Sequence, residues 1–347
     1  IFLLISNFIL KISMSNFIKT FLILFLIVPA TTFGYEFSAM TLNVDNLFDT
    51  LDDIKKDDKA YLPIEFKQSD AHKKSCNRIR VNSWKNECLY LDWNEDTKNA
   101  KLKNLANSII SYGQNGPDII ALQEVENNNI LSQLFDLLKP YGYIDSILIE
   151  GKDYRGIDTA LISRFKIVDS KLHYIKFSGE FEGKDTRPIL DATLEVNGDK
   201  LKIYNVHFPS GFHDVSMRID SLNVLSGLLN RHNYPTIALG DFNVNTKEDN
   251  KLNIYKSQEI YWSVAHIYAC DDCKGSFYYN YGKTWEFLDT IFLSKDRGIS
   301  YIEDTIEIYR TKSNSYNDTG KPINFNPAKK NGVSDHLPMV AKFEIIN

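Results

Sequence analysis

Short apolar runs recur along most of the chain, and many of them are bounded by Gly, Pro, Asn or Asp. Runs of this length and composition predict β-strands. We expect strands at residues 36–44, 118–122, 144–149, 159–163, 189–196, 201–206, 236–239, 288–293 and 339–345. The pair Asn197-Gly198 separates two of these runs and predicts a tight hairpin between them.

Three longer segments show a different pattern, in which apolar residues recur at helical spacing. Leu102, Leu105 and Ile109 follow this spacing, so we predict a helix over residues 98–112. The same pattern predicts helices over the segments 129–138 and 215–229. Strands outnumber helices, and several neighbouring strands are expected to be antiparallel. This combination favours two packed sheets with helices outside them, in one domain.

Residues 51–96 interrupt the pattern, because they are polar and show no clear period. We interpret this segment as a long surface insertion. It contains a local basic patch at residues 71–85, which has no acidic residue. The basic side chains of the patch are His72, Lys73, Lys74, Arg78, Arg80 and Lys85. A solvated loop without a ligand is the alternative interpretation of the patch.

The first 34 residues have the pattern of a secretory signal peptide. They contain no acidic residue, and from Met14 onwards a short basic start precedes an apolar core over residues 21–28. Small residues follow and place the expected cleavage near Gly34. An uncleaved membrane anchor is the alternative, but the apolar core is short for a span, which needs roughly 20 residues. We expect a secreted or periplasmic single domain over residues 35–347, with no stable membrane association and no obligate protein partner.

The four cysteines are expected to form disulfides, because an even count in an exported chain favours them. Our first choice is the pairing Cys76–Cys88 and Cys270–Cys273, since each pair lies within one loop-like segment. A zinc site and a redox motif at Cys270–Cys273 are the alternatives. Only one of the two pairs has the two-residue spacing that zinc sites prefer.

Charge limits how the chain can meet a polyanion. The formal net charge is −5 at pH 7, so the chain cannot rely on global attraction to nucleic acid. A polyanionic substrate must instead be met by a local basic patch and by metal ions.

Polar groups suited to phosphoester chemistry lie in or at the ends of five strand-like runs. These groups are in the segments Gln123-Glu124, Asn205-Val206-His207, Gly240-Asp241-Phe242-Asn243, Leu288-Asp289 and Ser334-Asp335-His336-Leu337-Pro338. Cleavage of a phosphodiester requires a positioned and deprotonated water, a stabilised transition-state charge and a neutralised leaving oxygen. Carboxylate and amide oxygens hold Mg²⁺, which serves the first two needs. The pattern therefore predicts a metal-assisted hydrolase whose site gathers at the ends of a sheet.

The residue types suggest individual roles. Asn43, Glu124 and Asp335 are the expected metal ligands at strand ends. His336 is the expected general base, with Asp289 as the carboxylate that orients it.

Three further residues complete the predicted site. His207 is the expected general acid. Asp241 and Asn243 are two positions apart in an extended turn, so both can point into the same site.

Taken together, these motifs resemble the endonuclease/exonuclease/phosphatase superfamily, which includes pancreatic-type DNases, abasic-site endonucleases, neutral sphingomyelinases and inositol polyphosphate 5-phosphatases. The resemblance extends over residues 40–343, and its strongest motifs are residues 239–243 and 334–338. It implies a DNase I-like fold, an α/β four-layer α-β-β-α sandwich with two packed mixed β-sheets. It also implies Mg²⁺, with Mn²⁺ as a substitute.

The resemblance implies further roles. Asp45 is implied as a helper of the metal ligands, and Asp241 with Asn243 as a phosphate and second-metal pair. Asp158 is our choice for the carboxylate partner of His207. The implied phosphate contacts are Arg155 and, as a weaker candidate, Arg187.

Three features favour nucleic acid as the substrate: the basic patch, export, and the aromatic run at residues 277–281 with Trp285, which could stack on bases. A half-buried strand is the alternative for the aromatic run. The alternative substrates are a lipid headgroup, as in a sphingomyelinase, or a phosphoinositide, but no long apolar membrane-docking loop is visible. A binding module without activity is the non-enzymatic alternative.

Overall fold

The computed structural model describes residues 34–270 and 273–346, and contacts between them form one compact unit from Tyr35 to Ile345. The segment on which the signal-peptide prediction rests lies outside the described residues, apart from Gly34. In the described part of the chain, none of the helices combines the length and apolarity that crossing a bilayer requires.

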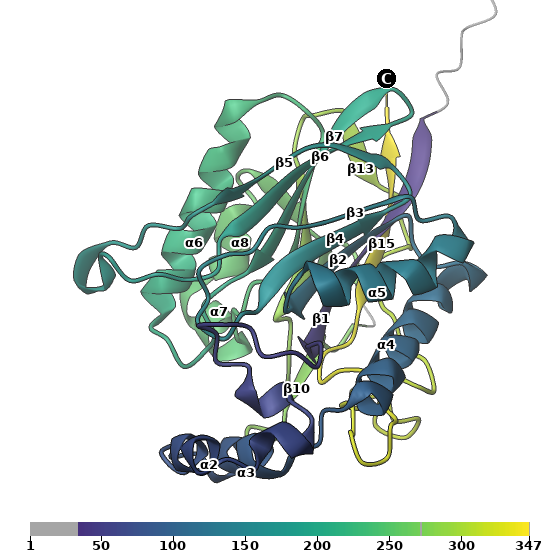
Figure 1. Cartoon of the computed structure of the whole chain (residues 1–347). Helices are drawn as coiled ribbons and strands as arrows, with labels where there is room; N and C mark the ends of the chain where they lie inside the picture. The colour runs from purple at the N-terminus through teal and green to yellow at the C-terminus, as the bar shows by residue number, and fades with distance from the viewer. Residues whose placement is uncertain (1–33, 271–272, 347) are drawn as a thin grey trace, which may run out of the picture. The chain divides into compact units, whose positions relative to one another are not determined.

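Two mixed β-sheets form the centre of this unit (Figure 1). The first sheet has the order β13 (Ile299–Tyr301), β15 (Met339–Ile345), β1 (Tyr35–Leu47), β2 (Ile119–Val125), β4 (Asp158–Ser163) and β3 (Asp145–Leu148), with β14 (Glu307–Ile308) paired to β15. The second has the order β5 (Lys166–His173), β6 (Ile189–Val196), β7 (Asp199–His207), β8 (Thr236–Asp241), β12 (Asp289–Ser294) and β9 (Trp262–Val264). The pairs β1–β2 and β7–β8 are parallel, whereas the other pairs are antiparallel.

The sheets pack face to face, and helices cover their outer faces. Apolar residues of both sheets, such as Ala39 and Ile203, form the core between them. Helices α4 (Glu95–Ile110) and α5 (Asn128–Leu138) cover the first sheet, while α6 (Val215–Leu228) and α8 (Ile254–Gln258) cover the second. Because the central strands are buried on both faces, they appear in the sequence as continuous apolar runs. The predicted four-layer α-β-β-α sandwich is confirmed.

Most predicted elements are present, with small shifts at their ends. The hairpin at Asn197-Gly198 joins β6 to β7, and both residues have positive φ, as a tight hairpin turn requires. Helix α4 begins at Glu95, earlier than predicted, because the side chain of Asn94 caps it by accepting from the Thr97 N–H. Strand β5 was not predicted, since it is an edge strand in which no residue is buried and the apolar residues form no continuous run.

The segment 51–96 contains short helices that the sequence did not predict. They are η1 (Lys59–Tyr61), η2 (Ile64–Lys67), α2 (Asp70–Cys76) and α3 (Asn82–Tyr90). Most residues of α2 and α3 are exposed, so an apolar period is absent. The cysteines are joined as Cys76–Cys88 and Cys270–Cys273, which is the pairing that we favoured.

Candidate active site

The predicted site residues come together where strands of both sheets end. Asn43 on β1 donates from Nδ2 to Asp241 Oδ2 on β8, over 3.1 Å. Below this contact, Gln123 Nε2 donates to Asn205 Oδ1 over 2.7 Å, and Asn205 Nδ2 donates to the carbonyls of Leu122 and Ala160. These side chains are buried and their hydrogen bonds cross between the sheets. The polar contacts therefore fix the relative position of the two sheets beneath the site.

Unusual backbone conformations direct the side chains into the site. Gly240 has a φ of 144°, and a Cβ there would lie 2.1 Å from the carbonyl oxygen of Val206. Glycine is therefore required immediately before Asp241. Asp45, Glu124 and Asn243 have φ values of 53°, 67° and 54°, which non-glycine residues rarely adopt. Such strain is found where the surrounding structure forces a side chain into a functional position.

His336 and Asp289 form a hydrogen-bonded pair. His336 Nδ1 lies 2.6 Å from Asp289 Oδ2, and Asp289 is fully buried. The ligand atoms of Asp241, Asp289 and His336 all lie within 4.8 Å of one another. Burial alone would lower the pKa of His336, but the charges of Asp289, Asp335 and Asp241 together raise it well above its usual value. The hydrogen bond orients the imidazole, and the carboxylate of Asp289 would stabilise the positive charge that a general base gains when it accepts a proton. The base must be neutral before that step, and the positive charge of a bound metal ion would oppose the effect of the neighbouring carboxylates and favour the neutral imidazole.

Oxygen donors gather beside this pair. Glu124 Oε2 accepts the Asn46 N–H over 3.0 Å, and Asp335 Oδ1 lies 3.9 Å from His336 Nε2. Burial and the charges of Asp45 and Glu124 raise the pKa of Asp335 to about 7. Mutually repelling carboxylates, with a nearby amide oxygen on Asn43, are the donor set that a hard divalent cation such as Mg²⁺ prefers. The residues present therefore fit a divalent metal ion.

His207 is buried beside Asp241 and Glu124. Its Nε2 lies 3.7 Å from Asp241 Oδ2 and 3.8 Å from Glu124 Oε1. Burial, followed by the charges of Arg187, Arg155 and His336, lowers the pKa of His207 well below its usual value. The imidazole is therefore neutral in this structure at neutral pH.

Arg187 fixes the backbone of His207. Its Nε donates to His207 O over 3.1 Å, its Nη2 donates to Phe208 O over 3.0 Å, and its Nη1 donates to Asp153 Oδ2 over 3.2 Å. Arg187 is buried, so this geometry makes it a positioning residue for His207. Arg155, by contrast, has a half-exposed side chain whose Nε lies 3.8 Å from Asp153 Oδ1.

The structure does not bring Asp158 into an ion pair with His207. Asp158 Oδ1 accepts the Gly151 N–H over 2.9 Å, and burial raises the pKa of this carboxyl to about 6. Asp158 Oδ2 and His207 Nδ1 are both buried, and neither has a hydrogen-bond partner among the described residues.

Asn243 joins the turn after β8 to the end of β7. Its backbone N–H donates to Asp241 Oδ1 over 2.9 Å, and its Nδ2 donates to Phe208 O over 3.0 Å. These contacts leave Asn243 Oδ1 as the group available to a ligand.

Several residues near the site were not predicted. Lys101 on α4 is buried and donates from Nζ to the carbonyls of Asp45 and Val333, both over 3.0 Å. Ser334 Oγ donates to Asn43 O over 2.6 Å and accepts the His336 N–H over 3.0 Å. Ser334 belongs to the motif at residues 334–338. For Lys101, the only indication in the sequence was a lysine within the apolar face of the predicted helix.

Aromatic residues also border the site. The ring of Phe277, on β10 (Phe277–Tyr279), lies 5.0 Å from the ring of His336, and the two residues form a backbone bridge. Burial, followed by the charges of Asp45, Glu87 and Glu124, raises the pKa of Tyr61 well above its usual value. The ring of Tyr61, in the segment 51–96, stacks on that of Phe48, which follows β1.

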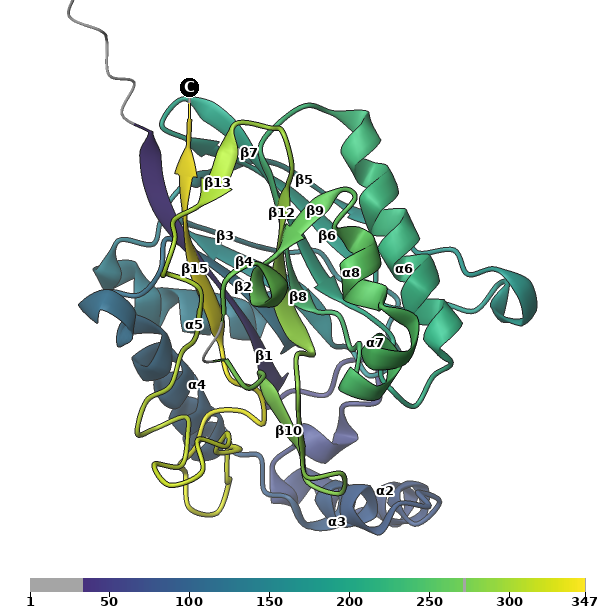
Figure 2. The ribbon, with the colours of Figure 1, turned by 180° about the vertical axis from the view of Figure 1, so that it is seen from behind.

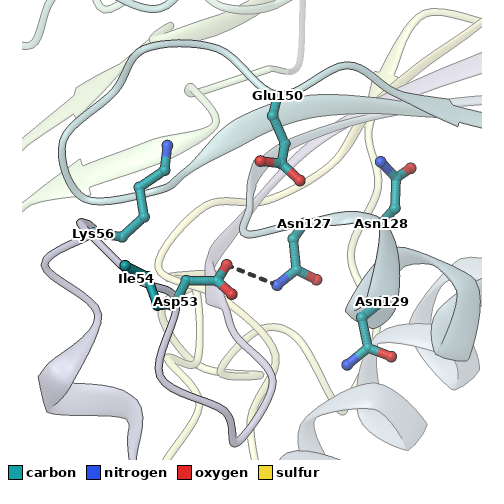
Figure 3. Close-up of a pocket in the computed structure, with 7 residues that line it drawn as sticks. All are labelled: Asp53, Ile54, Lys56, Asn127, Asn128, Asn129 and Glu150. Carbon is teal, nitrogen blue, oxygen red and sulfur yellow. Dashed lines mark hydrogen bonds between the residues drawn. The ribbon is translucent and has the colours of Figure 1, made fainter.

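A polar pocket with a cavity volume of about 310 Å³ lies beside the N-terminus of α5 (Figure 3). Asn127 Nδ2 donates there to Asp53 Oδ2 over 3.1 Å. The residues that line it are Asp53, Ile54, Lys56, Asn127, Asn128, Asn129 and Glu150. None of the predicted site residues lines this pocket.

Comparisons with known proteins agree with the fold. A structure from Bacteroides thetaiotaomicron, described as an endonuclease/exonuclease/phosphatase family protein, superposes with a TM-score of 0.54 and 16% identity, over 90% of this chain and 98% of that chain. A mannosyl-6-phosphatase from B. thetaiotaomicron VPI-5482 superposes with a TM-score of 0.54 and 15% identity, over 88% of this chain and 99% of that one. A humanized TDP2 from D. rerio superposes with a TM-score of 0.51 and 16% identity, over 89% of this chain and 98% of that chain. These identities are too low to show more than a common fold.

Sequence comparison gives the family. No curated protein matches the chain. The model of the Endonuclease/Exonuclease/phosphatase family matches residues 88–344, which is more than half of the chain. The protein therefore belongs to this family of phosphoester hydrolases.

Proposed function

We propose that the protein is a secreted, Mg²⁺-dependent phosphodiesterase that cleaves nucleic acid, with DNA as the main substrate. The observation that carries this proposal is the 2.6 Å contact between His336 and Asp289, which orients a base whose ligand atom lies within 4.8 Å of that of Asp241. Mn²⁺ is expected to substitute for Mg²⁺, because both ions accept carboxylate and amide oxygens.

The residues would divide the reaction as follows. His336 takes a proton from the attacking water, and Asp289 holds the imidazole in the required tautomer. Asn43, Glu124 and Asp335 would hold the metal ion, with Asp45 as a helper. When bound, the ion would stabilise the negative charge that develops on the phosphoryl oxygens.

His207 would protonate the leaving oxygen. Its Nε2 faces Asp241 and Glu124, and a phosphate bound beside it would add negative charge that favours the protonated imidazole. The bond between phosphorus and the 3′ oxygen then breaks, so one product ends in a 3′-hydroxyl and the other in a 5′-phosphate. Asp241 is the alternative acid, since burial and the charge of Asp289 raise its pKa to about 7.

The surroundings of the site favour a polyanion. Lys321 Nζ lies 3.7 Å from the ring centre of Tyr278 on β10, and Arg310 lies over Trp285 at 5.6 Å. Tyr281, in the same hairpin, is 93% exposed. Exposed aromatic rings beside cations suit a substrate that carries both bases and phosphates.

The alternative function is hydrolysis of a lipid headgroup phosphodiester or of a phosphoinositide. It is supported by the family, which includes phosphatases as well as nucleases. A compact phosphomonoester would need only the metal and the two histidines, and would gain nothing from the exposed aromatic hairpin.

One comparison of substrates tests the proposal. Protein produced without residues 1–34 is incubated with Mg²⁺ and plasmid DNA, RNA, sphingomyelin, phosphoinositides or mannose 6-phosphate. We expect nicking and then fragmentation of the DNA, with 5′-phosphate ends. Turnover of a lipid or sugar phosphate without cleavage of nucleic acid would contradict the proposal, and binding of DNA without any turnover would favour the non-enzymatic alternative.

A further inference from the structure

Helices α2 and α3 form a small two-helix arm, residues 69–90, whose shape is held by two links. The disulfide Cys76–Cys88 joins the helices, and His72 Nε2 lies 2.9 Å from the carbonyl oxygen of Cys88. The side chain of Ser69 caps the first helix by accepting the His72 N–H. The arm is therefore a fixed structure, although few of its residues are buried.

The exposed surface of the arm is basic. Lys73, Lys74, Arg78 and Arg80 are exposed, and in the described part of the chain none of them forms an ion pair. Residues 71–86 contain no acidic residue, although the chain as a whole has a net charge of −5. Unpaired cations gathered on one rigid element of an acidic protein indicate a surface that meets an anionic ligand.

A buried lysine connects the arm to the rest of the protein. Lys67 is 1% exposed. Its Nζ donates to the carbonyl oxygens of Ala60 and Leu91, each at a distance of 2.6 Å, and to that of Glu87 at 3.4 Å. It therefore fixes the C-terminal end of α3 against the turns that precede the arm.

Those turns pack directly onto the strand that carries two of the proposed metal ligands. Tyr61 stacks on Phe48 with ring centres 4.1 Å apart, and Trp93 Nε1 donates to Phe48 O over 3.1 Å. Phe48 follows the last residue of β1, the strand that carries Asn43 and Asp45. The arm thus has a fixed position next to the candidate active site.

The arm lies on the same side of the molecule as the site. Figure 2 shows α2, α3 and β10 at the end of the sheets towards which β1 runs.

We propose that the arm binds backbone phosphates of a double-stranded nucleic acid beside the scissile bond. The inference rests on the proposed function and names its substrate as a duplex. A rigid arm with basic side chains on α2 and on the loop that joins α2 to α3 can contact several phosphates of a stiff duplex at once. The large apolar face of a membrane-binding helix is absent from α2 and α3, whose only large exposed apolar side chains are Trp84 and Tyr90.

A charge-reversal variant tests the inference. Lys73→Glu with Arg80→Glu changes the arm, whereas Lys166→Glu with Lys200→Glu makes the same charge change at the opposite end of the second sheet, next to the hairpin at residues 197–198. Binding to a labelled duplex is measured with Mg²⁺ in the His336→Ala background, so that cleavage does not interfere. We expect the dissociation constant to rise at least about tenfold for the arm variant and less than about twofold for the control. In a plot of the logarithm of the association constant against the logarithm of the salt concentration, the slope should become less negative by about 2 for the arm variant.

Turnover of a small nitrophenyl phosphodiester provides the second measurement, in the His336 wild-type background. It should be unchanged in the arm variant, because the arm does not reach a substrate without a duplex. If the charge-reversed arm does not fold, Lys73→Gln with Arg80→Gln is measured in its place. Equal weakening by arm and control variants, or unchanged duplex affinity, would overturn the inference. Loss of binding to anionic vesicles with duplex affinity intact would identify a membrane surface and also overturn it.

Binding and cleavage separate this inference from the proposed function. Arm-dependent duplex binding without cleavage by the wild-type protein would leave the arm's role intact and refute the nuclease. Cleavage of DNA that is equally efficient with the arm variant would leave the nuclease intact and refute the arm's role.

Discussion

Asn43 Nδ2 donates to Asp241 Oδ2 over 3.1 Å, and this hydrogen bond joins the two sheets at the edge where the candidate active site lies. Asn43 Oδ1 accepts the Asp45 N–H over 3.0 Å, so both ends of the amide have fixed partners. The amide nitrogen is therefore committed to Asp241, while the amide oxygen, which has two lone pairs, can still accept a second partner beside the Asp45 N–H. This contact positions the proposed metal ligands of β1 relative to the groups of β8.

The first prediction concerns metal dependence. Hydrolysis should stop in excess EDTA and return with Mg²⁺ or Mn²⁺. Glu124→Gln should retain the fold but lose more than about 100-fold of the metal-supported activity, because an amide replaces a charged ligand. Undiminished hydrolysis in EDTA would contradict the metal mechanism.

Glu126→Gln is the matched control. Burial and the charges of Asp49, Asp53 and Asp58 raise the pKa of Glu126 to about 9, so its carboxyl is neutral at pH 7. The substitution by a neutral amide should therefore leave the metal titration unchanged. A comparable loss of activity in both variants would mean that the effect comes from the backbone around β2.

The second prediction concerns Gly240. Gly240→Ala should destabilise the protein by about 3 kcal/mol or more, because the added Cβ would meet Val206 O at 2.1 Å and φ is 144°. Gly227→Ala is the control, since Gly227 lies in α6 and a Cβ there would meet nothing within 4 Å. Urea unfolding should show that the Gly227→Ala variant is more stable than the wild type by about 0.5–1 kcal/mol. Equal stability of the two variants would show that the β7–β8 contact tolerates a side chain.

The sequence revealed the groups that lie at strand ends, because each of them is part of a short local motif. Asp241 is the last residue of β8 and Asn243 follows it, while Asp335 and His336 precede β15. Their convergence depends on strand order, which the family resemblance implied and which the apolar pattern alone did not specify.

The direction of single side chains could not be predicted. Arg187 was expected to contact phosphate, but its donors face the carbonyls of His207 and Phe208. The sequence around an arginine in a loop does not indicate whether its guanidinium faces solvent or the backbone of a neighbouring strand. The same reason explains Asp158, whose Oδ1 is used by the Gly151 N–H. The helices of the arm escaped prediction because a disulfide and Lys67 order them without an apolar stripe.

The third prediction concerns redox state. Cys76–Cys88 and Cys270–Cys273 should be bridged in the native protein, because the proposed export would bring the chain into an oxidising space. Mass spectrometry of non-reduced peptides should recover both linked pairs. Four free thiols would refute the pairing and would favour the zinc alternative.

The fourth prediction concerns stability against pH. His266 stacks on Phe287 with ring centres 4.4 Å apart, its Nδ1 lies 2.8 Å from Thr290 Oγ1, and burial lowers its pKa to about 3. Between the unfolded pKa of about 6.5 and the folded pKa of about 3, the unfolded chain binds more protons at this residue. His266 therefore costs stability as the pH falls through this window, by at most about 1.4 kcal/mol per pH unit.

Urea unfolding of the wild type and of His266→Gln between pH 7 and pH 4 measures this contribution. The variant should be less stable at pH 7, because it loses the stacked ring, and its stability should fall less steeply towards low pH. Parallel pH profiles of the two proteins would show that His266 is protonated as readily in the folded state as in the unfolded state.

The last prediction concerns the two histidines. His336→Ala and His207→Ala should each lower the rate of DNA hydrolysis by about 10²–10⁴, which is the usual effect of losing a positioned base or acid. The binding of Mg²⁺ should be largely retained in both variants, since neither histidine is a proposed ligand. A nitrophenyl phosphodiester distinguishes their roles, because its leaving group needs no proton. The His207 variant should recover on this substrate, whereas the His336 variant should not, since the attacking water still has to lose a proton. If both variants respond alike, the proposed division between base and acid is wrong, and Asp241, hydrogen-bonded to Asn43 and 3.7 Å from His207 Nε2, becomes the better candidate for one of the two roles.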